Sequence, residues 1–314
     1  MRTSYRIGVD ENGLGARLGP LLVTAVLAKV DERGERLLGK KRPKRFAAWV
    51  GDSKDLVSHH DVALGEAWAR LLGGEDAETP HELFARLSLE GLSRLREPCP
   101  GHVHEQCWST AGEGFVAEPE LVEGVRGVRN QLRERGVELA LARSSTLCTQ
   151  RLNAERGRGK NRFVSDLHAM EELVLSLRKH AGADVTAVCG KVGGMADYCR
   201  FFGPLSGWLC AVVEQRRERS AYRFPGLGEL SFVQDADAKD PLVMLASLVG
   251  KYLRELLMAR VARHWVTALD GRDESLPSGY NDPVTARFVE ASALLRAKRR
   301  VPDTCFERAK AADD

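Results

Sequence analysis

The sequence predicts a folded α/β protein in which helices cover both faces of a mixed sheet, and three observations support this. Short apolar segments with the length of strands alternate with longer segments of helical periodicity. Hydrophobic residues make up 43% of the 314 residues, which is enough for a substantial core. Acidic residues also follow directly after two of the predicted strands, where a rigid element can hold them in place.

The first predicted strand ends in an acidic pair. Ile7 and Val9 alternate with small or polar neighbours, which is typical of a short buried strand. This strand delivers Asp10 and Glu11 to a loop rich in glycine (residues 13–19). Carboxylates are the hard oxygen ligands that Mg²⁺ and Mn²⁺ prefer, and glycines let the backbone of a polyanion approach. Taken alone, the segment is equally consistent with a strand that ends in a polar turn.

The remaining elements follow from periodicity and from capping residues. Further strands are expected at 21–30, 137–142, 184–189 and 229–234, with edge strands or a hairpin between 207 and 222. Helices are expected at about 58–72, 121–135, 165–180, 241–265 and 283–298, with Ser165, Asp240 and Asp282 as N-caps. Residues 153–161 form a polar loop whose basic side chains can meet a phosphate backbone, although flexible surface loops look the same.

The region from 73 to 122 has little periodicity and several prolines, so we expect an insertion with short helices. Within it, Cys99, His102, His104 and Cys107 form a donor set that zinc could use, but their spacing is not that of a standard zinc site.

Composition points to a cytoplasmic protein that does not bind membranes. The longest apolar stretches are shorter than the ~18 residues of a membrane span, and the N-terminus has no basic-then-apolar signal sequence. The seven cysteines contain no CxxC pair, which favours reduced thiols. The net charge is only +3, but basic runs at 40–45 and 296–300 are candidates for phosphate contact, the alternative being a solvated surface.

Several separated motifs occur in an order that is more specific than any one of them. They are GVDENGLG with a following GP, DSK at 52–54, DADAK at 235–239, ASLVGKYLRE at 246–255 and SGYNDPVT at 278–285. In order and approximate spacing this set resembles the type 2 ribonuclease H (ribonuclease HII-like) family. The resemblance implies a ribonuclease H-like mixed sheet with flanking helices. It divides the chain into an α/β core (1–240), with an irregular insertion near 75–135, and a helical C-terminal extension (241–314) packed on that core.

The resemblance also implies an activity. Enzymes of this family use four acids and two divalent cations, Mg²⁺ or Mn²⁺, to cut the RNA strand of an RNA–DNA hybrid or a ribonucleotide-containing duplex. Asp10, Glu11 and Asp237 match three of the catalytic, metal-binding acids. The matched substrate-binding positions are Gly13, Leu14, Gly15, Ser53, Lys54, Lys239 and Tyr280. We expect a monomer whose partner is nucleic acid.

Two departures from the family pattern leave a second function open. The remaining acid should end the strand at 185–189, where this chain has Cys189 or Gly190, and neither is a good Mg²⁺ ligand. Leu14 also stands where the family's glycine-rich loop carries an arginine. Asp197, Glu214 and Asp235 are the nearby carboxylates considered as substitutes. The alternative function is therefore a ribonuclease H-like nucleic-acid-binding protein with weak or no cleavage.

Overall fold

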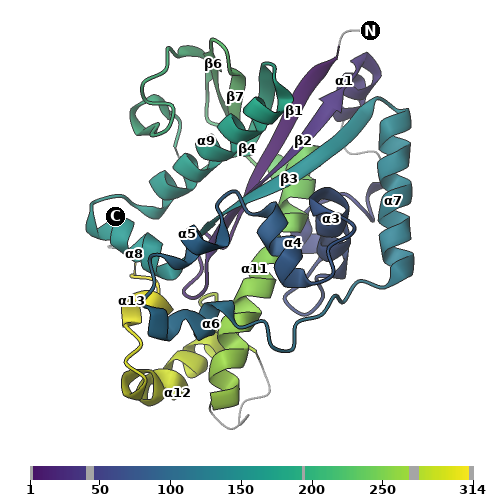
Figure 1. The fold of residues 1–314 in the computed structure, drawn as a ribbon. Helices are drawn as coiled ribbons and strands as arrows, with labels where there is room; N and C mark the ends of the chain where they lie inside the picture. Colours follow the sequence, from purple (N-terminus) through teal and green to yellow (C-terminus); the bar gives the residue numbers. More distant parts are fainter. Residues whose placement is uncertain (1–2, 40–45, 193–194, 269–275, 311–314) are drawn as a thin grey trace.

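The computed structural model describes residues 3–39, 46–192, 195–268 and 276–310 (Figure 1). Within these residues the chain forms one seven-stranded sheet of order β3-β2-β1-β4-β7-β6-β5. The strands are β1 (Ser4–Asn12), β2 (Leu21–Val30), β3 (Val137–Leu147), β4 (Val185–Gly190), β5 (Ala211–Gln215), β6 (Arg219–Phe224) and β7 (Gly228–Val233).

The sheet combines antiparallel and parallel pairing. β1, β2 and β3 form an antiparallel meander, and β5, β6 and β7 form a second one. Between them, β4 runs parallel to both β1 and β7. The carboxyl ends of β1, β4 and β7 therefore meet at one edge of the sheet. This arrangement, with the helices described next, is a ribonuclease H-like α/β fold, and the predicted fold class is confirmed.

The interior strand β2 is apolar on both faces because both faces are covered. Leu22 and Val26 belong to one hydrophobic cluster, while Val23 and Leu27 belong to another on the opposite face. Alternation of side chains along a strand explains how one continuous apolar run serves two cores. The continuous apolar sequence of β2 therefore agrees with its burial on both faces of the sheet.

Two groups of helices supply the rest of these cores. The first cluster contains α3 (Ala63–Gly73), α7 (Pro119–Glu134) and α11 (Pro241–Ala268), and α4 (Pro80–Leu87) packs beside them. The second cluster is formed by α9 (Arg162–Ala181). Gly8 on β1 permits close packing of α11, because a Cβ at this position would lie 2.3 Å from the backbone of Leu242.

Short helices complete the chain. They are α1 (Glu32–Leu38), α2 (Ser53–Leu56), α5 (Leu92–Arg96), α6 (His104–Trp108), α8 (Thr149–Gly157), α10 (Ala236–Lys239) and α13 (Asp303–Phe306), with 3₁₀ turns at Gly101–Val103 and Cys199–Phe201. The longer α12 (Pro283–Lys298) lies with α13 near the far end of α11 (Figure 1), where Trp265, Phe288 and Phe306 form a third apolar cluster.

The structure corrects three local predictions. The helix expected from residue 58 begins at Ala63, after the separate short helix α2. The loop expected at 153–161 is mostly helical, because α8 extends to Gly157. Asn161, not Ser165, is the N-cap of α9, and its side chain accepts a hydrogen bond from the Val164 amide.

The N-caps predicted for the two C-terminal helices are present. Asp240 accepts a hydrogen bond from the Leu242 amide at the start of α11, and Asp282 accepts one from the Thr285 amide at the start of α12. Among the described helices, none is both long enough and apolar enough to cross a membrane.

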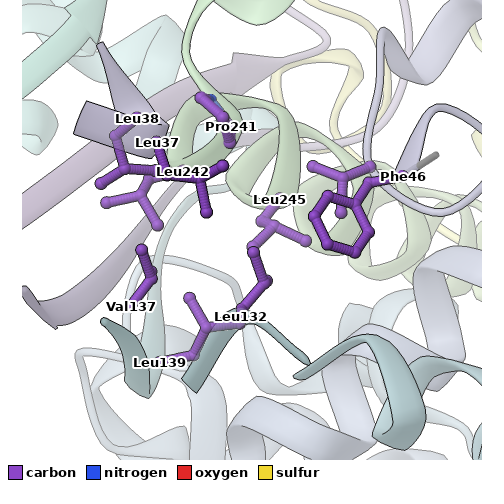
Figure 2. A pocket seen from close by; sticks show the side chains of 10 residues that line it. Leu37, Leu38, Phe46, Leu132, Val137, Leu139, Pro241, Leu242 and Leu245 are labelled. Carbon is purple, nitrogen blue, oxygen red and sulfur yellow. The ribbon is translucent and has the colours of Figure 1, made fainter. Parts of the chain in front are cut away.

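A narrow apolar pocket lies between α1, α7, β3 and α11 (Figure 2). Its volume is about 20 Å³, and its lining includes Leu38, Phe46, Leu132 and Leu245. An opening of this size with no polar lining is a packing gap between helices, not a site for chemistry.

Candidate active site

Asp10 and Glu11 end β1 at the edge where the parallel strands finish. Asp10 is buried, with 7% of its surface exposed, and it lies beside Ser247 of α11. The Ser247 hydroxyl also lies 2.9 Å from the hydroxyl of Ser53. Ser53, which the sequence placed at the substrate, is itself buried and so does not lie on the open surface.

Asp237 approaches this pair from the short helix that follows β7. The turn is sharp, because Asp235 adopts a left-handed backbone conformation with φ of 53°. The Asp237 carboxylate is 3.1 Å from the amine of Lys54, whose side chain is otherwise mostly exposed. The structure therefore brings Asp10, Glu11, Asp237 and Lys54 into one cluster.

Burial and mutual repulsion raise the pKa values of the Asp10 and Glu11 carboxyl groups. Burial, and next the charge of Glu11, raises the pKa of Asp10 well above its usual range. Burial is also the main cause that raises the pKa of Glu11 to about 7, with a contribution from the charge of Asp237. Such a concentration of partly buried negative charge favours a bound cation.

The position opposite Asp10 on β4 is Gly190. A Cβ placed on Gly190 would lie 3.3 Å from Asp10 Oδ1 and 3.3 Å from Glu11 Oε2. Cys189 instead points into the core on the α9 face and is fully buried. Of the two positions considered for the missing acid, Gly190 is therefore the one that lies beside Asp10.

The three substitutes considered from the sequence are all engaged elsewhere. Each forms an ion pair with a nearby base: Asp197 with Arg200 (3.0 Å), Glu214 with Arg219 (2.5 Å) and Asp235 with Lys239 (3.8 Å). All three ion pairs lie at the surface. None of these acids is among the groups whose charges raise the pKa of Asp10 or of Glu11.

Sequence reasoning missed Asp166, in the second turn of α9. Its side chain is fully buried, and neither carboxylate oxygen has a hydrogen-bond partner among the described residues. It is close enough to Glu11 and Asp10 for their charges to raise its pKa, in addition to the larger effect of burial. Its spacing from Met170 and Leu173 places it on the buried stripe of the helix, and an acid at such a position is the signal that was available.

The glycine-rich loop after β1 is held from below by two buried arginines. Arg308 donates to the carbonyls of Gly13 (2.6 Å) and Gly19 (2.9 Å). Arg254 packs under Gly13, where a Cβ would lie 2.4 Å from its Nε atom. Gly13 has a φ of +88°, so both conformation and space require glycine there.

Tyr280 lies beside this loop. The carbonyl of Gly279 accepts hydrogen bonds from the amides of Arg17 (2.8 Å) and Leu18 (2.9 Å), which joins the two loops. The guanidinium of Arg254 stacks 4.3 Å from the centre of the Tyr280 ring, whose residue is 42% exposed. The ring is therefore fixed in position yet accessible.

Lys239 does not contact Asp10, Glu11 or Asp237. Its amine donates to the carbonyl of Gln234 (2.6 Å) and lies 3.8 Å from Asp235. Of the two lysines expected at the substrate, Lys54 therefore contacts the acidic cluster and Lys239 does not.

A basic pocket of about 490 Å³ lies between the glycine-rich loop and the segment from Leu152 to Phe163. Its lining includes Leu14, Gly15, Arg156, Lys160 and Arg162. A backbone loop beside several cations is suited to phosphate. The basic run at 40–45 lies outside the described residues.

The C-terminal basic run is structural in part. Arg296 is buried 3.9 Å from the centre of the Phe306 ring, and Arg299 contacts His264 at 3.0 Å. These contacts leave those two guanidinium groups engaged within the protein.

The donor set considered for zinc does not converge. His102 hydrogen bonds to the carbonyl of Arg300, and His104 to that of Cys99. Cys99 and Cys107 instead line a narrow cavity with Cys148 and Cys305. In the described part of the chain, no three His, Cys, Asp or Glu side chains are already arranged around one metal position.

The acidic cluster nevertheless has the chemistry that a hard divalent cation requires. Its donors are all carboxylates, and oxygens of Asp10 and Glu11 both lie 3.3 Å from one point, the Cβ position of Gly190. The nearby Asp166 has two buried oxygens without partners among the described residues. These residues fit Mg²⁺ or Mn²⁺ better than a softer metal.

Comparison with known proteins gives matches among solved structures only. No protein-family model and no curated protein matches the chain. The RNase HII of the PCNA:RNase HII complex from Archaeoglobus fulgidus is 16% identical, with a TM-score of 0.41 and coverage of 98% of this chain and 96% of that one. Ribonuclease H2 from Pyrococcus horikoshii OT3 is also 16% identical, with a TM-score of 0.43 and coverage of 96% and 95%.

A third similar structure is Bst-RNase HIII in complex with Mn²⁺, at 11% identity and a TM-score of 0.46. That match covers 97% of this chain and 66% of the other, so the present chain spans about two thirds of the Bst-RNase HIII chain. The assignment of the fold comes from the strand order described above, not from these matches.

Proposed function

We propose that the chain is a metal-dependent endoribonuclease of the type 2 ribonuclease H class, which cleaves the RNA strand of RNA–DNA hybrids or of ribonucleotide-containing duplexes. The observation that carries this proposal is the meeting of Asp10, Glu11 and Asp237 at the carboxyl edge of the parallel strands, with Lys54 in contact. Several converging carboxylates at a rigid strand end are what phosphodiester hydrolysis with divalent cations needs.

Mg²⁺ or Mn²⁺ would be held by Asp10, Glu11 and Asp237. When bound, a pair of such ions stabilises the charge on the attacking and departing oxygens of a phosphodiester. The protein's own part begins with orientation: strand β1 holds Asp10 and Glu11 next to each other, and burial beside Ser247 of α11 restricts the Asp10 side chain. The Lys54 amine lies 3.1 Å from the Asp237 carboxylate and so holds this side chain in place at the acidic cluster.

The surrounding loops supply the substrate contacts. The backbone amides of the loop at Gly13, Leu14 and Gly15 can donate to a ribose hydroxyl whatever side chain stands between the glycines. Tyr280 offers an exposed ring face for a sugar or base, held in place by Arg254. The basic pocket beside Leu14 provides cations for phosphates further along a strand.

A second candidate function is nucleic-acid binding with weak or no cleavage. The observation that favours it is Gly190, which leaves the strand edge with three matched acids instead of four. Fewer negative charges would weaken the binding of divalent cations, while the basic and aromatic substrate contacts would remain.

One assay separates the two functions. Labelled RNA–DNA hybrid and a duplex with a single ribonucleotide are incubated with the protein in Mg²⁺ and in Mn²⁺. The same reactions are run with D10N, D237N and, as a matched control, E120Q on the exposed start of α7. The proposal expects cleavage of the RNA strand that D10N and D237N remove and E120Q retains. Binding without cleavage would establish the second function, and neither binding nor cleavage would contradict both.

A further inference from the structure

Asp166 is a buried acid that has neither a hydrogen-bond donor nor a basic partner among the described residues. It has no exposed surface, and both oxygens lack hydrogen-bond partners within the described residues. An ionised carboxylate in such a place is very unfavourable unless a cation or several donors compensate it. The side chain therefore either stays protonated in the core or is a ligand of a cation.

The charged and titratable groups around Asp166 favour the second possibility. Its electrostatic neighbours are Glu11, Asp10, Cys189 and Tyr198, none of which carries a positive charge. The Tyr198 hydroxyl accepts a hydrogen bond from the Val192 amide and makes none with Asp166. A bound cation is thus the counter-charge that the described surroundings of Asp166 lack.

The two faces of the sheet explain how Asp166 can reach the acidic cluster. Asp10 contacts Ser247 of α11 on one face, whereas Val9 and Cys189 pack in the α9 cluster on the other. Side chains alternate along β1, so Glu11 follows Val9 toward the α9 face, and Glu11 is the acid with the largest effect on Asp166. Asp166 therefore approaches the end of the sheet from the face opposite α11.

We propose that Asp166 replaces the acid that is absent at Gly190, and that it binds a divalent cation together with Glu11 and Asp10. This inference rests on the proposed function, because it names the fourth acidic ligand of the same site. It restores the count of four carboxylates while moving one of them from a strand end to the second turn of a helix. An aspartate is thereby explained at a helix position where the chain otherwise places apolar residues.

The test is a direct measurement of metal binding. Mn²⁺ is titrated calorimetrically into the wild-type protein, D166N and D197N, the last being a matched control on the surface in an ion pair with Arg200. We expect D166N to weaken at least one Mn²⁺ association by tenfold or more, and D197N to bind like the wild type. Equal Mn²⁺ affinity in D166N and the wild type would overturn the assignment.

A second measurement guards against a purely structural effect. Without metal, D166N should melt at the same temperature as the wild type or higher, because it removes a buried acid that has no partner. With saturating Mn²⁺, the wild type should gain melting temperature and D166N should gain less. If D166N does not fold, D166S is used in the same two measurements.

Rescue completes the design. Adding G190D to D166N should return Mn²⁺ affinity toward the wild-type value, because it restores a fourth carboxylate beside Asp10 and Glu11. Failure of G190D to improve affinity in D166N would count against a shared role.

The outcomes also separate this inference from the proposed function. If Mn²⁺ binding depends on Asp166 but hybrid is never cleaved, the ligand assignment stands and the nuclease proposal fails. If hybrid is cleaved and D166N binds Mn²⁺ normally, the nuclease proposal stands and the assignment fails.

Discussion

Gly190 faces Asp10 across the parallel strands β4 and β1, so that a Cβ on Gly190 would lie 3.3 Å from the nearer carboxylate oxygen of Asp10. This distance is tight enough to require a small adjustment but leaves room for a side chain that extends outward from the edge. The relationship explains why one of the two candidate positions on β4 can hold an acid beside Asp10 and the other cannot.

G190D should therefore raise Mn²⁺ affinity and hybrid cleavage, because it adds a carboxylate beside Asp10 and Glu11. C189D should instead destabilise the protein by roughly 3–5 kcal/mol, since it buries an unpaired charge in the α9 core. Calorimetric titration of Mn²⁺ and urea denaturation measure the two effects, with G190A as the control for bulk alone. A gain in metal affinity with C189D would contradict the strand register.

Lys54 should matter for activity more than for stability. Its ion pair with Asp237 is largely exposed on the lysine side, so K54A should change the free energy of unfolding by no more than about 1 kcal/mol. Loss of the cation next to the acidic cluster should lower kcat for hybrid cleavage by roughly 10²-fold. K239A is the matched comparison and should lower kcat less, because Lys239 is turned toward Gln234 and Asp235.

Arg308 should be important for stability through the glycine-rich loop. Its guanidinium donates to the carbonyls of Gly13 and Gly19 in a buried setting, and R308A leaves each with only one longer hydrogen bond, from the Ala16 amide (3.2 Å) and the Thr149 hydroxyl (3.3 Å). We expect a loss of roughly 2–4 kcal/mol in the free energy of unfolding by urea denaturation. R158A, at an exposed position after α8, should stay within about 0.5 kcal/mol of the wild type. Equal stabilities of R308A and R158A would show that the loop does not need this anchor.

Glu171 gives a prediction for pH dependence. Burial raises its pKa to about 7, although its carboxylate accepts hydrogen bonds from the amides of Gly203 and Leu205. The folded protein therefore binds a proton at Glu171 that the unfolded chain releases near pH 4.5, and stability falls as pH rises between about 4.5 and 7. The size of this fall is roughly 3 kcal/mol for a shift of this magnitude.

E171Q should remove that contribution. The free energy of unfolding of the wild type minus that of E171Q should decrease as pH rises from 5 to 7, measured by urea denaturation at each pH. A difference that stays constant over this range would contradict a raised pKa at Glu171.

Binding to RNA–DNA hybrid should depend strongly on salt. If the basic pocket beside Leu14 contacts phosphates, the logarithm of the affinity falls linearly with the logarithm of salt concentration. R156A should then reduce the slope by about 1, the value for loss of one phosphate contact. Fluorescence anisotropy with a labelled hybrid measures both slopes, and an unchanged slope in R156A would remove that residue from the contact.

Local patterns were sufficient for much of the fold. The apolar run of β2, the helical stripe of α9 and the capping pairs Asp240-Pro241 and Asp282-Pro283 are decided by residues near in sequence. Periodicity and capping act over a few residues, so they can be recognised without knowing the tertiary structure. The division into domains and the roles of the individual site residues stay predictions.

Boundaries were less accurate where polar sequence had no clear periodicity. The segment at 153–161 is rich in glycine and charge, and it was expected to be a loop. In the structure its first half belongs to α8, whose N-cap is Cys148 and whose Leu152 is buried. Packing of one or two residues can override weak local preference, and a single sequence does not contain that packing.

The choice between Cys189 and Gly190 shows what local sequence leaves open. Both residues end the same strand, and a shift of one residue in register would exchange their faces. Pairing of β4 with β1 places Val9 beside Cys189 and so turns Cys189 into the core. Register depends on contacts between segments about 180 residues apart, which no local pattern specifies.

Asp166 makes the same point for the acidic cluster. In the sequence Asp166 is one acid in a predicted helix, about 155 residues after Glu11. The candidates Asp197, Glu214 and Asp235 drew attention instead, because they follow the strand at 185–190 in the sequence. In the folded chain these three acids pair with arginine or lysine at the surface, and α9 carries Asp166 to the buried end of β1. Residue types near a motif can be listed from sequence, but proximity to a carboxylate is a property of packed helices and sheets, because only packing brings distant segments into contact.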